Sequence, residues 1–184
     1  MVKLTNLCRF VISPLALVCV ATAHAQSYLD VDIGVAYSDV SPSEPSPIDG
    51  DFTDGSASYH LGLGAYRNNK DSRWIYGVKV ELQDVDGSSL LSVRAIDLGY
   101  KLTPNIVLNG FLGAARYDLA TPATGFRFGI GGQFWFSRKW ALTAEAAYGD
   151  SVARDKLLPG EVPGTSPDIF FDIAQLNVYI KFKF

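Results

Sequence analysis

A histidine, a serine and a carboxylate are the residues best suited to chemistry in this chain. Ser58 and His60 lie two residues apart in "SYHLGLGAY", and Glu81 lies in a later segment. These are the groups of a hydrolytic triad, in which the histidine takes the proton of the serine hydroxyl. No motif of an activated nucleophile surrounds Ser58 or His60. The three residues are therefore catalytic candidates, and a hydrogen-bonded wall histidine is the simpler interpretation.

A second candidate is an acidic cluster in "DGDFTDG", which contains Asp49, Asp51 and Asp54. Hard cations such as calcium bind clustered carboxylates. The spacing departs from the EF-hand pattern, because Asp54 occupies the position of the turn glycine and His60 that of the bidentate glutamate. A solvated loop stiffened by proline explains the same residues. We name the three aspartates as metal candidates and expect neither a metal nor a cofactor.

These residues lie among segments that alternate in polarity. About ten residues alternate, a turn signal follows, and the pattern recurs, which is typical of β-strands. The eight expected strands are roughly 27–38, 57–67, 73–84, 91–102, 106–117, 124–136, 140–149 and 168–184. The connections after the odd-numbered strands include two long loops, 39–56 and 150–167. Those after the even-numbered strands are short, so the sequence predicts an eight-stranded antiparallel up-and-down transmembrane β-barrel.

One face of each expected strand is aliphatic or aromatic, and the other is small or polar. The polar face carries too few charges for a solvated surface, but its glycines suit the interior of a narrow barrel. We therefore place the apolar face outward, with aromatic residues at both ends of the strands. The polar face predicts an ion network in the lumen: Asp30, Asp32, Lys79, Glu81, Asp97, Lys101, Arg127, Glu145 and Lys181, with Lys183 on the same face.

The interior charges have two interpretations, a ladder of salt bridges that plugs the lumen or an ion path. Eight strands leave little room beyond side chains, which favours the plug. Two strands have an uncertain register. If Ile96 and Leu98 face outward, strict alternation also turns Arg94 outward unless a bulge intervenes. In 106–117, Leu108 and Phe111 compete for the lipid face.

The N-terminus has the pattern of a secretory signal peptide. Lys3 and Arg9 precede a short apolar run, and "AHA" at 23–25 matches a cleavage site. We expect residues 1–25 to be removed and residues 26–184 to form a single domain. Cleavage removes both cysteines, so disulfides and thiol chemistry are not expected. The 16 basic residues lose two members against 19 acidic ones, which gives a net charge of −5. This balance argues against nucleic-acid binding.

The signal peptide, eight amphipathic strands, alternating loop lengths and terminal "YIKFKF" resemble the OmpA-like family of small outer-membrane barrels. The resemblance implies the outer membrane of a Gram-negative bacterium, contact with its lipid and lipopolysaccharide, and a monomer. In that family a C-terminal phenylalanine is read by the barrel-assembly machinery. Phe184 would be that assembly signal, with Phe182 and Ile180 as supporting positions.

The sequence favours a non-enzymatic barrel with a structural or surface-interaction role carried by loops 39–56 and 150–167. One alternative is a lipid A-modifying enzyme, because some small outer-membrane barrels deacylate lipid A. Their pattern has His before Ser near the last strands, whereas this chain has Ser-Tyr-His in its second expected strand. A further alternative is a soluble periplasmic lipocalin-like binding barrel.

Overall fold

The computed structural model describes residues 25–42, 55–69, 71–85, 87–118, 121–154 and 170–184. These residues form eight long strands and one two-residue strand. The long strands are β1 (Ala25–Pro42), β2 (Ser56–Asn69), β3 (Trp74–Val85), β4 (Ser88–Lys101), β5 (Ile106–Tyr117), β7 (Gly125–Trp135), β8 (Trp140–Arg154) and β9 (Phe170–Lys183). The short strand β6 (Thr121–Pro122) pairs with β8. The expected strands all occur, and several extend a few residues further than predicted.

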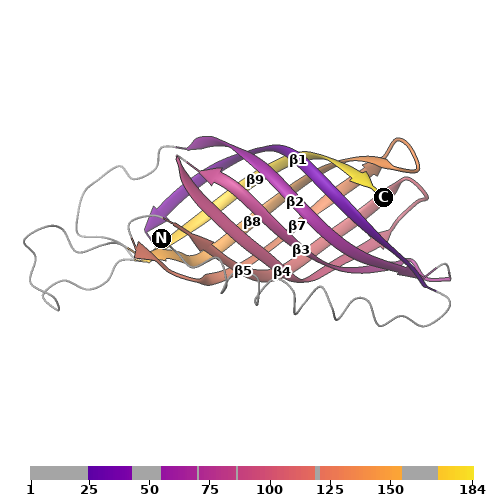
Figure 1. Cartoon of the computed structure of the whole chain (residues 1–184), viewed down its shortest axis with the longest axis horizontal. Coiled ribbons are helices and arrows are strands. Elements are labelled where there is room, and N and C mark those ends of the chain that lie inside the picture. Colours follow the sequence, from indigo (N-terminus) through magenta and orange to yellow (C-terminus); the bar gives the residue numbers. More distant parts are fainter. Residues whose placement is uncertain (1–24, 43–54, 70, 86, 119–120, 155–169) are drawn as a thin grey trace, which may run out of the picture.

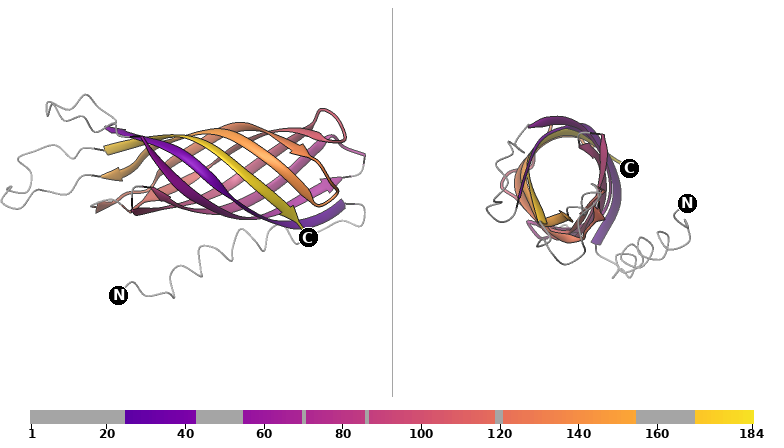
Figure 2. Two further views of the ribbon diagram at one scale, coloured as in Figure 1. Left: turned by 90° about the horizontal axis from the view of Figure 1, so that it is seen from above. Right: turned by 90° about the vertical axis from the view of Figure 1, so that its left-hand side faces the viewer.

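The long strands close into a barrel in which every neighbouring pair is antiparallel. Sequential strands pair with one another from β1 to β5 and from β7 to β9, and β5 pairs with β7. The ring closes where β1 pairs with β9, with Ile33 opposite Ile180. Figure 1 shows the tilted strands from the side, and the right-hand view of Figure 2 shows the ring end-on. The predicted fold class is confirmed.

Short polar turns join the strands at the end of the barrel that holds the C-terminus (Figure 1). In the turn between β4 and β5, the Thr103 hydroxyl accepts hydrogen bonds from the backbone N–H groups of Asn105 and Ile106. The Ser137 hydroxyl accepts equivalent bonds between β7 and β8. Side-chain oxygens of this kind satisfy backbone donors where the chain reverses. We call this end of the barrel the turn end, and the opposite one the loop end.

The apolar face of each strand lies on the outside. Large side chains on every long strand are exposed, among them Ile33, Phe126 and Ile130, with exposed fractions of 67%, 70% and 73%. In a water-soluble barrel such residues would fill the interior. The orientation is therefore that of a transmembrane barrel, whose lipid-facing band is apolar. This arrangement rules out the soluble lipocalin-like alternative.

Aromatic residues lie at both levels expected for the two membrane interfaces. At the turn end, Trp74 packs edge-on against Tyr100, with ring centroids 4.9 Å apart, and Trp140 packs against Phe182 at 4.6 Å. Tyr59, near the loop end, is 78% exposed. Tryptophan and tyrosine are amphipathic, so they are favoured at the two interfaces between hydrocarbon and water.

A bulge in β4 determines the orientation of Arg94, which the sequence left open. Lys79 of β3 pairs with Arg94, but Gly77 pairs with Asp97, so β4 has one residue more than its partner. The pairing with β5 shifts at the same place, next to Ala95. Ala95 and Ile96 therefore both face outward, while Arg94 and Asp97 face inward. Of the two alternatives for this strand, strict alternation and a bulge, the structure has the bulge.

The ambiguity in β5 is also resolved. Ile106, Leu108 and Leu112 face outward, whereas Val107, Phe111 and Tyr117 are buried inside the barrel: these last three lie on the other face of the same strand. The described residues contain no helix long and apolar enough to cross a membrane. Residues 1–24 of the expected signal peptide lie outside the described residues, as do most of loops 39–56 and 150–167 and the metal candidates Asp49, Asp51 and Asp54.

Candidate functional site in the barrel lumen

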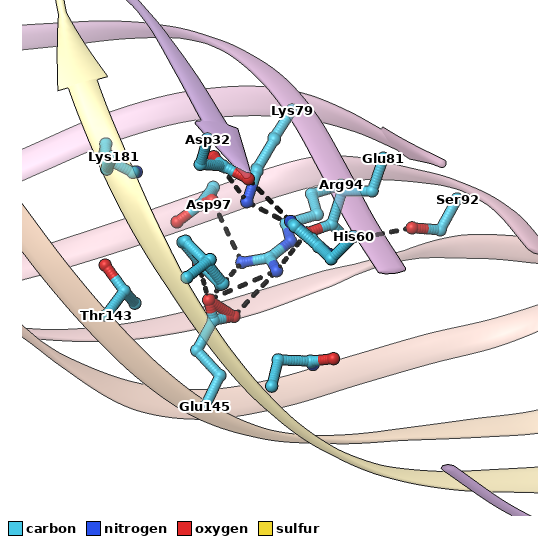
Figure 3. A network of polar contacts seen from close by, with 12 residues as sticks. Asp32, His60, Lys79, Glu81, Ser92, Arg94, Asp97, Thr143, Glu145 and Lys181 are labelled. Carbon is cyan, nitrogen blue, oxygen red and sulfur yellow. Dashed lines mark hydrogen bonds and ion pairs between the residues drawn. The ribbon is translucent and has the colours of Figure 1, made fainter. Parts of the chain in front are cut away.

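The lumen holds most of the buried charge of the described chain (Figure 3). The ionisable side chains of this network come from seven strands and are all buried: Asp30 and Asp32 of β1, His60 of β2, Lys79 and Glu81 of β3, Arg94 and Asp97 of β4, Arg127 of β7, Glu145 of β8 and Lys181 of β9. Glycines on the inner wall leave space for them. A Cβ atom at Gly62 would collide with the Asp32 carboxylate and the Lys79 side chain. The glycine-rich strands thus make room for long charged side chains.

Glu81 is the centre of this network. Its carboxylate lies 3.0 Å from Nζ of Lys79, 2.5 Å from Nη2 of Arg94 and 3.3 Å from Nη1 of Arg127. The Ser92 hydroxyl donates a further bond to it at 2.9 Å. Three cations around one buried carboxylate supply the compensation that a charge needs in a low-dielectric interior.

Arg94 links this centre to the opposite wall. Its Nη2 atom lies 2.7 Å from the Glu145 carboxylate of β8, and its Nη1 atom lies 3.5 Å from Asp97. The guanidinium carbon lies 3.7 Å from the centroid of the Phe111 ring, a cation–π arrangement. The Tyr179 hydroxyl of β9 also donates to Glu145. These contacts cross the lumen and tie β4, β8 and β9 together.

A second set of pairs lies along β1. Asp32 contacts Nζ of Lys79 at 2.9 Å and Nε2 of His60 at 2.6 Å. Asp30 contacts Nζ of Lys181 at 2.9 Å. The imidazole of His60 stacks on the Tyr179 ring, with centroids 4.8 Å apart and planes at 10°. The network thus continues from the centre of the lumen to the seam between β1 and β9.

The directions of the hydrogen bonds determine which ring nitrogen of His60 carries the proton. Arg127 can only donate, so its 2.7 Å contact identifies the oxygen of the Gln175 amide. The Gln175 nitrogen then donates to the Gln83 oxygen at 2.7 Å, which leaves the Gln83 nitrogen facing Nδ1 of His60 at 2.8 Å. Nδ1 must therefore accept. The proton lies on Nε2 and is donated to Asp32.

The catalytic candidates do not form a triad in this arrangement. The Ser58 hydroxyl donates to the backbone carbonyl of Ala36 at 3.4 Å. Both ring nitrogens of His60 have partners, Asp32 and Gln83. Glu81 lies 3.7 Å from Nε2 of His60. The geometry is that of the simpler interpretation, a hydrogen-bonded histidine in the lumen wall.

The other site candidates are placed as follows. Lys101 lies at the turn end, apart from the central ion pairs, where its Nζ donates to the side-chain oxygen of Asn68 at 2.5 Å and to the Ser72 carbonyl at 3.2 Å. Ile180, Phe182 and Phe184 line the outer face of the last strand, and the ring centroids of the two phenylalanines lie 4.9 Å apart. Among the described residues, no group of three or more His, Cys, Asp or Glu side chains could hold a metal ion.

Several members of the network were not among the predicted site residues: Ser92, Arg94, Gln83, Gln175 and Tyr179. The inward register of β3 and β9 already places Gln83, Gln175 and Tyr179 inside, so the alternation carried that signal. For Arg94 the one indication in the sequence was energetic: an arginine in the lipid-facing band is destabilising, which favours an inward position.

The fold and the lumen define a class: a small transmembrane β-barrel with an apolar exterior and a charged, side-chain-filled interior. Its architecture is that of eight-stranded outer-membrane barrels.

Solved structures of such proteins match this chain in fold. The attachment invasion locus protein Ail of Yersinia pestis aligns with a TM-score of 0.53 and 14% identity, over 86% of this chain and 99% of Ail. Ail in complex with the heparin analogue sucrose octasulfate aligns at 0.52 and 13% identity, with the same coverage. Neisserial surface protein A aligns at 0.53 and 15% identity, over 87% of this chain and 99% of its own. No protein-family model matches the chain, and no curated protein matches it in sequence.

Proposed function

We propose that this protein is a non-enzymatic outer-membrane barrel whose extracellular loops, 39–56 and 150–167, make its contacts with other molecules. The observation that carries the proposal is a lumen filled in three layers. A central ion network lies between an apolar cluster at the loop end, which includes Leu90, Tyr117 and Ile173, and a smaller one at the turn end around Tyr66 and Ile75. A filled interior leaves the outer face and the two ends for function.

Export and assembly follow from the sequence pattern. Residues 1–25 direct secretion and are removed, and the mature chain enters the outer membrane of a Gram-negative bacterium as a monomer. Phe184, with Phe182 and Ile180, serves as the signal read by the barrel-assembly machinery. The short turns then face the periplasm and the long loops face outward.

Lipid contact is supported by an apolar groove on the outer face near the loop end. The groove has a volume of about 510 Å³ and crosses β7, β8, β9 and β1. Large side chains border a floor that contains small ones: the border includes Tyr37, Phe128, Tyr148 and Leu176, and the floor includes Ala146 and Ala174. At this level the surrounding leaflet is the outer one, so an acyl chain of lipopolysaccharide is the expected occupant.

The first long loop of this chain is acidic, whereas a site for negatively charged sulfated sugars would be basic. Loop 39–56 contains five acidic residues and no basic one, and loop 150–167 has Arg154 and Lys156 beside Asp150, Asp155 and Glu161. Ail was solved with the heparin analogue sucrose octasulfate. The acidic first loop would repel such a polyanion, so we expect this protein to have a different partner.

Loop replacement tests the main proposal. Epitope tags inserted in 39–56 and 150–167 should be accessible to antibody on intact cells, whereas a tag in the turn at 103–105 should require permeabilised cells. Replacing residues 43–54 and 155–167 with short turns spares the buried Val152 and Ala153. It should leave the shift between boiled and unboiled samples on a gel, because the lumen holds the barrel together. Tags that react only after permeabilisation, or fractionation into the osmotic-shock fluid, would contradict the proposal.

The lipid contact needs its own experiment. The purified barrel should unfold at a higher temperature in vesicles that contain lipopolysaccharide than in phosphatidylcholine vesicles. Ala146→Trp fills the groove and should reduce this difference, whereas Ala114→Trp, another outward alanine, should keep it. An equal effect of the two variants would contradict a specific groove.

The lipid A-modifying alternative remains testable. It predicts a change in lipid A mass when the protein is overproduced, and loss of that change in His60→Ala. We expect no change in mass, because His60 is bound on both nitrogens inside the lumen.

A further inference from the structure

The turn end of the barrel contains an open cavity of about 400 Å³. It lies at the inner mouth of the lumen, between the short turns and the aromatic layer that covers the ion network. Its floor is formed by Tyr28, Ile75 and Val107, which also line the small space next to the network. The volume falls within the range of small-molecule sites, roughly 300–1,000 Å³. We call this cavity the vestibule.

The charges of the vestibule have one sign. Its lining contains Lys101, Arg138 and Lys183, and no carboxylate. This contrasts with the lumen, where Asp30 pairs with Lys181 and every other lysine or arginine has a carboxylate within reach. The acid of the network that lies opposite Lys183 in the β1–β9 pairing is Asp30, and its carboxylate is bound to Nζ of Lys181 instead.

The direct contacts of the two lysines in the vestibule are all with neutral groups. Nζ of Lys101 donates to neutral oxygens, those of Asn68 and Ser72. Nζ of Lys183 lies 4.2 Å from the centroid of the Tyr28 ring and 5.9 Å from that of Trp135. Neither lysine has a carboxylate within ion-pair distance among the residues that the structure describes. Positions of this kind attract an anion that carries several negative charges.

We propose that the vestibule is a binding site for small organic or inorganic polyanions that carry phosphate or carboxylate groups. The two lysines and Arg138 would contact the anionic groups. Asn68 and Asn105 supply polar side chains at the same mouth, and Trp135 offers an apolar wall. With the short turns facing the periplasm, which is the orientation proposed above, the ligand would come from that compartment. Binding to the purified protein does not depend on that orientation, so the two proposals can fail separately.

Trp135 provides the measurement. The chain has three tryptophans, and in the background Trp74→Phe with Trp140→Phe only Trp135 remains. The barrel folded in detergent would be titrated with inorganic pyrophosphate and, separately, with citrate, and the fluorescence of Trp135 recorded. We expect a saturable change for at least one of these probes, reduced by added sodium chloride because the attraction is electrostatic. The tighter probe identifies the preferred anionic group.

Matched charge variants separate a site from general attraction. Lys101→Gln combined with Lys183→Gln should weaken binding by at least tenfold. Lys139→Gln removes the same charge at the same end of the barrel, but Lys139 is exposed outside the vestibule, and this variant should bind within twofold of the parent. Lys183→Arg retains the charge and should retain binding. A gel shift on boiling confirms that each variant is folded, and the single substitutions replace the double one if it does not fold.

Two results would overturn the proposal. One is the lack of a saturable change with both probes at low salt. The other is an equal loss of affinity in Lys139→Gln and in the double variant, which would show that the anions respond only to net charge.

Discussion

Glu81 lies within 3.3 Å of three cationic side chains and is fully buried. Replacing it with glutamine leaves Lys79, Arg94 and Arg127 with fewer negative charges around them. Removing one partner from a buried ionic group costs about 3–5 kcal/mol. We expect Glu81→Gln to lower the free energy of unfolding by that order, measured by urea titration of the barrel in lipid vesicles.

The matched control for this prediction is Asp84→Asn, which removes an exposed carboxylate from the same strand. It should change stability by less than about 0.5 kcal/mol, as is usual for exposed surface positions. If Glu81→Gln were as mild as the control, the ion network would not contribute to the stability of the lumen.

The proton of His60 is a second prediction at the residue scale. Arg127, Gln175 and Gln83 orient one another so that Nδ1 of His60 accepts a hydrogen bond. The sequence has two histidines, His24 and His60. A barrel produced from residue 26 onward contains only His60, so ¹⁵N-histidine labelling gives one ring to observe by NMR. The Nδ1 resonance should have the shift of an unprotonated nitrogen and Nε2 that of a protonated one. Gln83→Ala should release this preference, and a proton on Nδ1 in the unaltered protein would contradict the assigned amide directions.

At the scale of elements, the bulge in β4 decides a register that the sequence left open. Alternation locates the strands and tells their two faces apart, because the side chains of a strand point to opposite sides in turn. It cannot locate an extra residue, since Ala95 suits either face. The charge of Arg94 favoured a bulge, because only an inward position keeps this side chain out of the lipid.

The same reasoning applies to the lumen. The inward positions of the ionisable residues follow from alternation, and most of the central network was predictable by face. The partner of each charge was not predictable, because a pairing such as Arg94 with Glu145 joins strands that are far apart in sequence. Such contacts depend on the tilt and closure of the barrel, which no local pattern records.

Deleting Ala95 tests the interpretation of the bulge. Without this residue, Arg94 would still face inward and Ile96 outward, and the pairing of β4 with both neighbours would become regular. We therefore expect the deletion variant to fold in vesicles and to keep the gel shift of the parent.

Deletion of Val93 is the matched control. It shortens β4 by the same amount but turns Arg94 toward the lipid, which costs about 2–4 kcal/mol near the middle of the bilayer. The folded fraction should fall sharply. If both deletions fold equally well, the register of β4 is not held by the orientation of Arg94.

At the scale of the whole molecule, the interior is divided into layers along the barrel axis. The apolar cluster at the loop end contains fully buried residues, including Val85, Leu90 and Ile173. The ion network follows, and then the aromatic layer with Tyr66. An ion moving through the lumen would have to cross two apolar layers and displace paired charges between them, so the interior acts as a plug.

The layered interior predicts that the protein does not conduct ions. Incorporated in a planar bilayer, the unaltered barrel should show no stepwise current over the voltage range in which porins are recorded as open pores. Glu81→Gln loosens the central layer but leaves both apolar layers in place, so it too should remain closed. Insertion is verified from the gel shift of the same protein in vesicles, so a flat trace cannot be ascribed to unfolded protein. Stepwise currents proportional to voltage from the folded, unaltered barrel would contradict the plug and favour the ion path. Such currents would mean that hydrated ions cross both apolar layers.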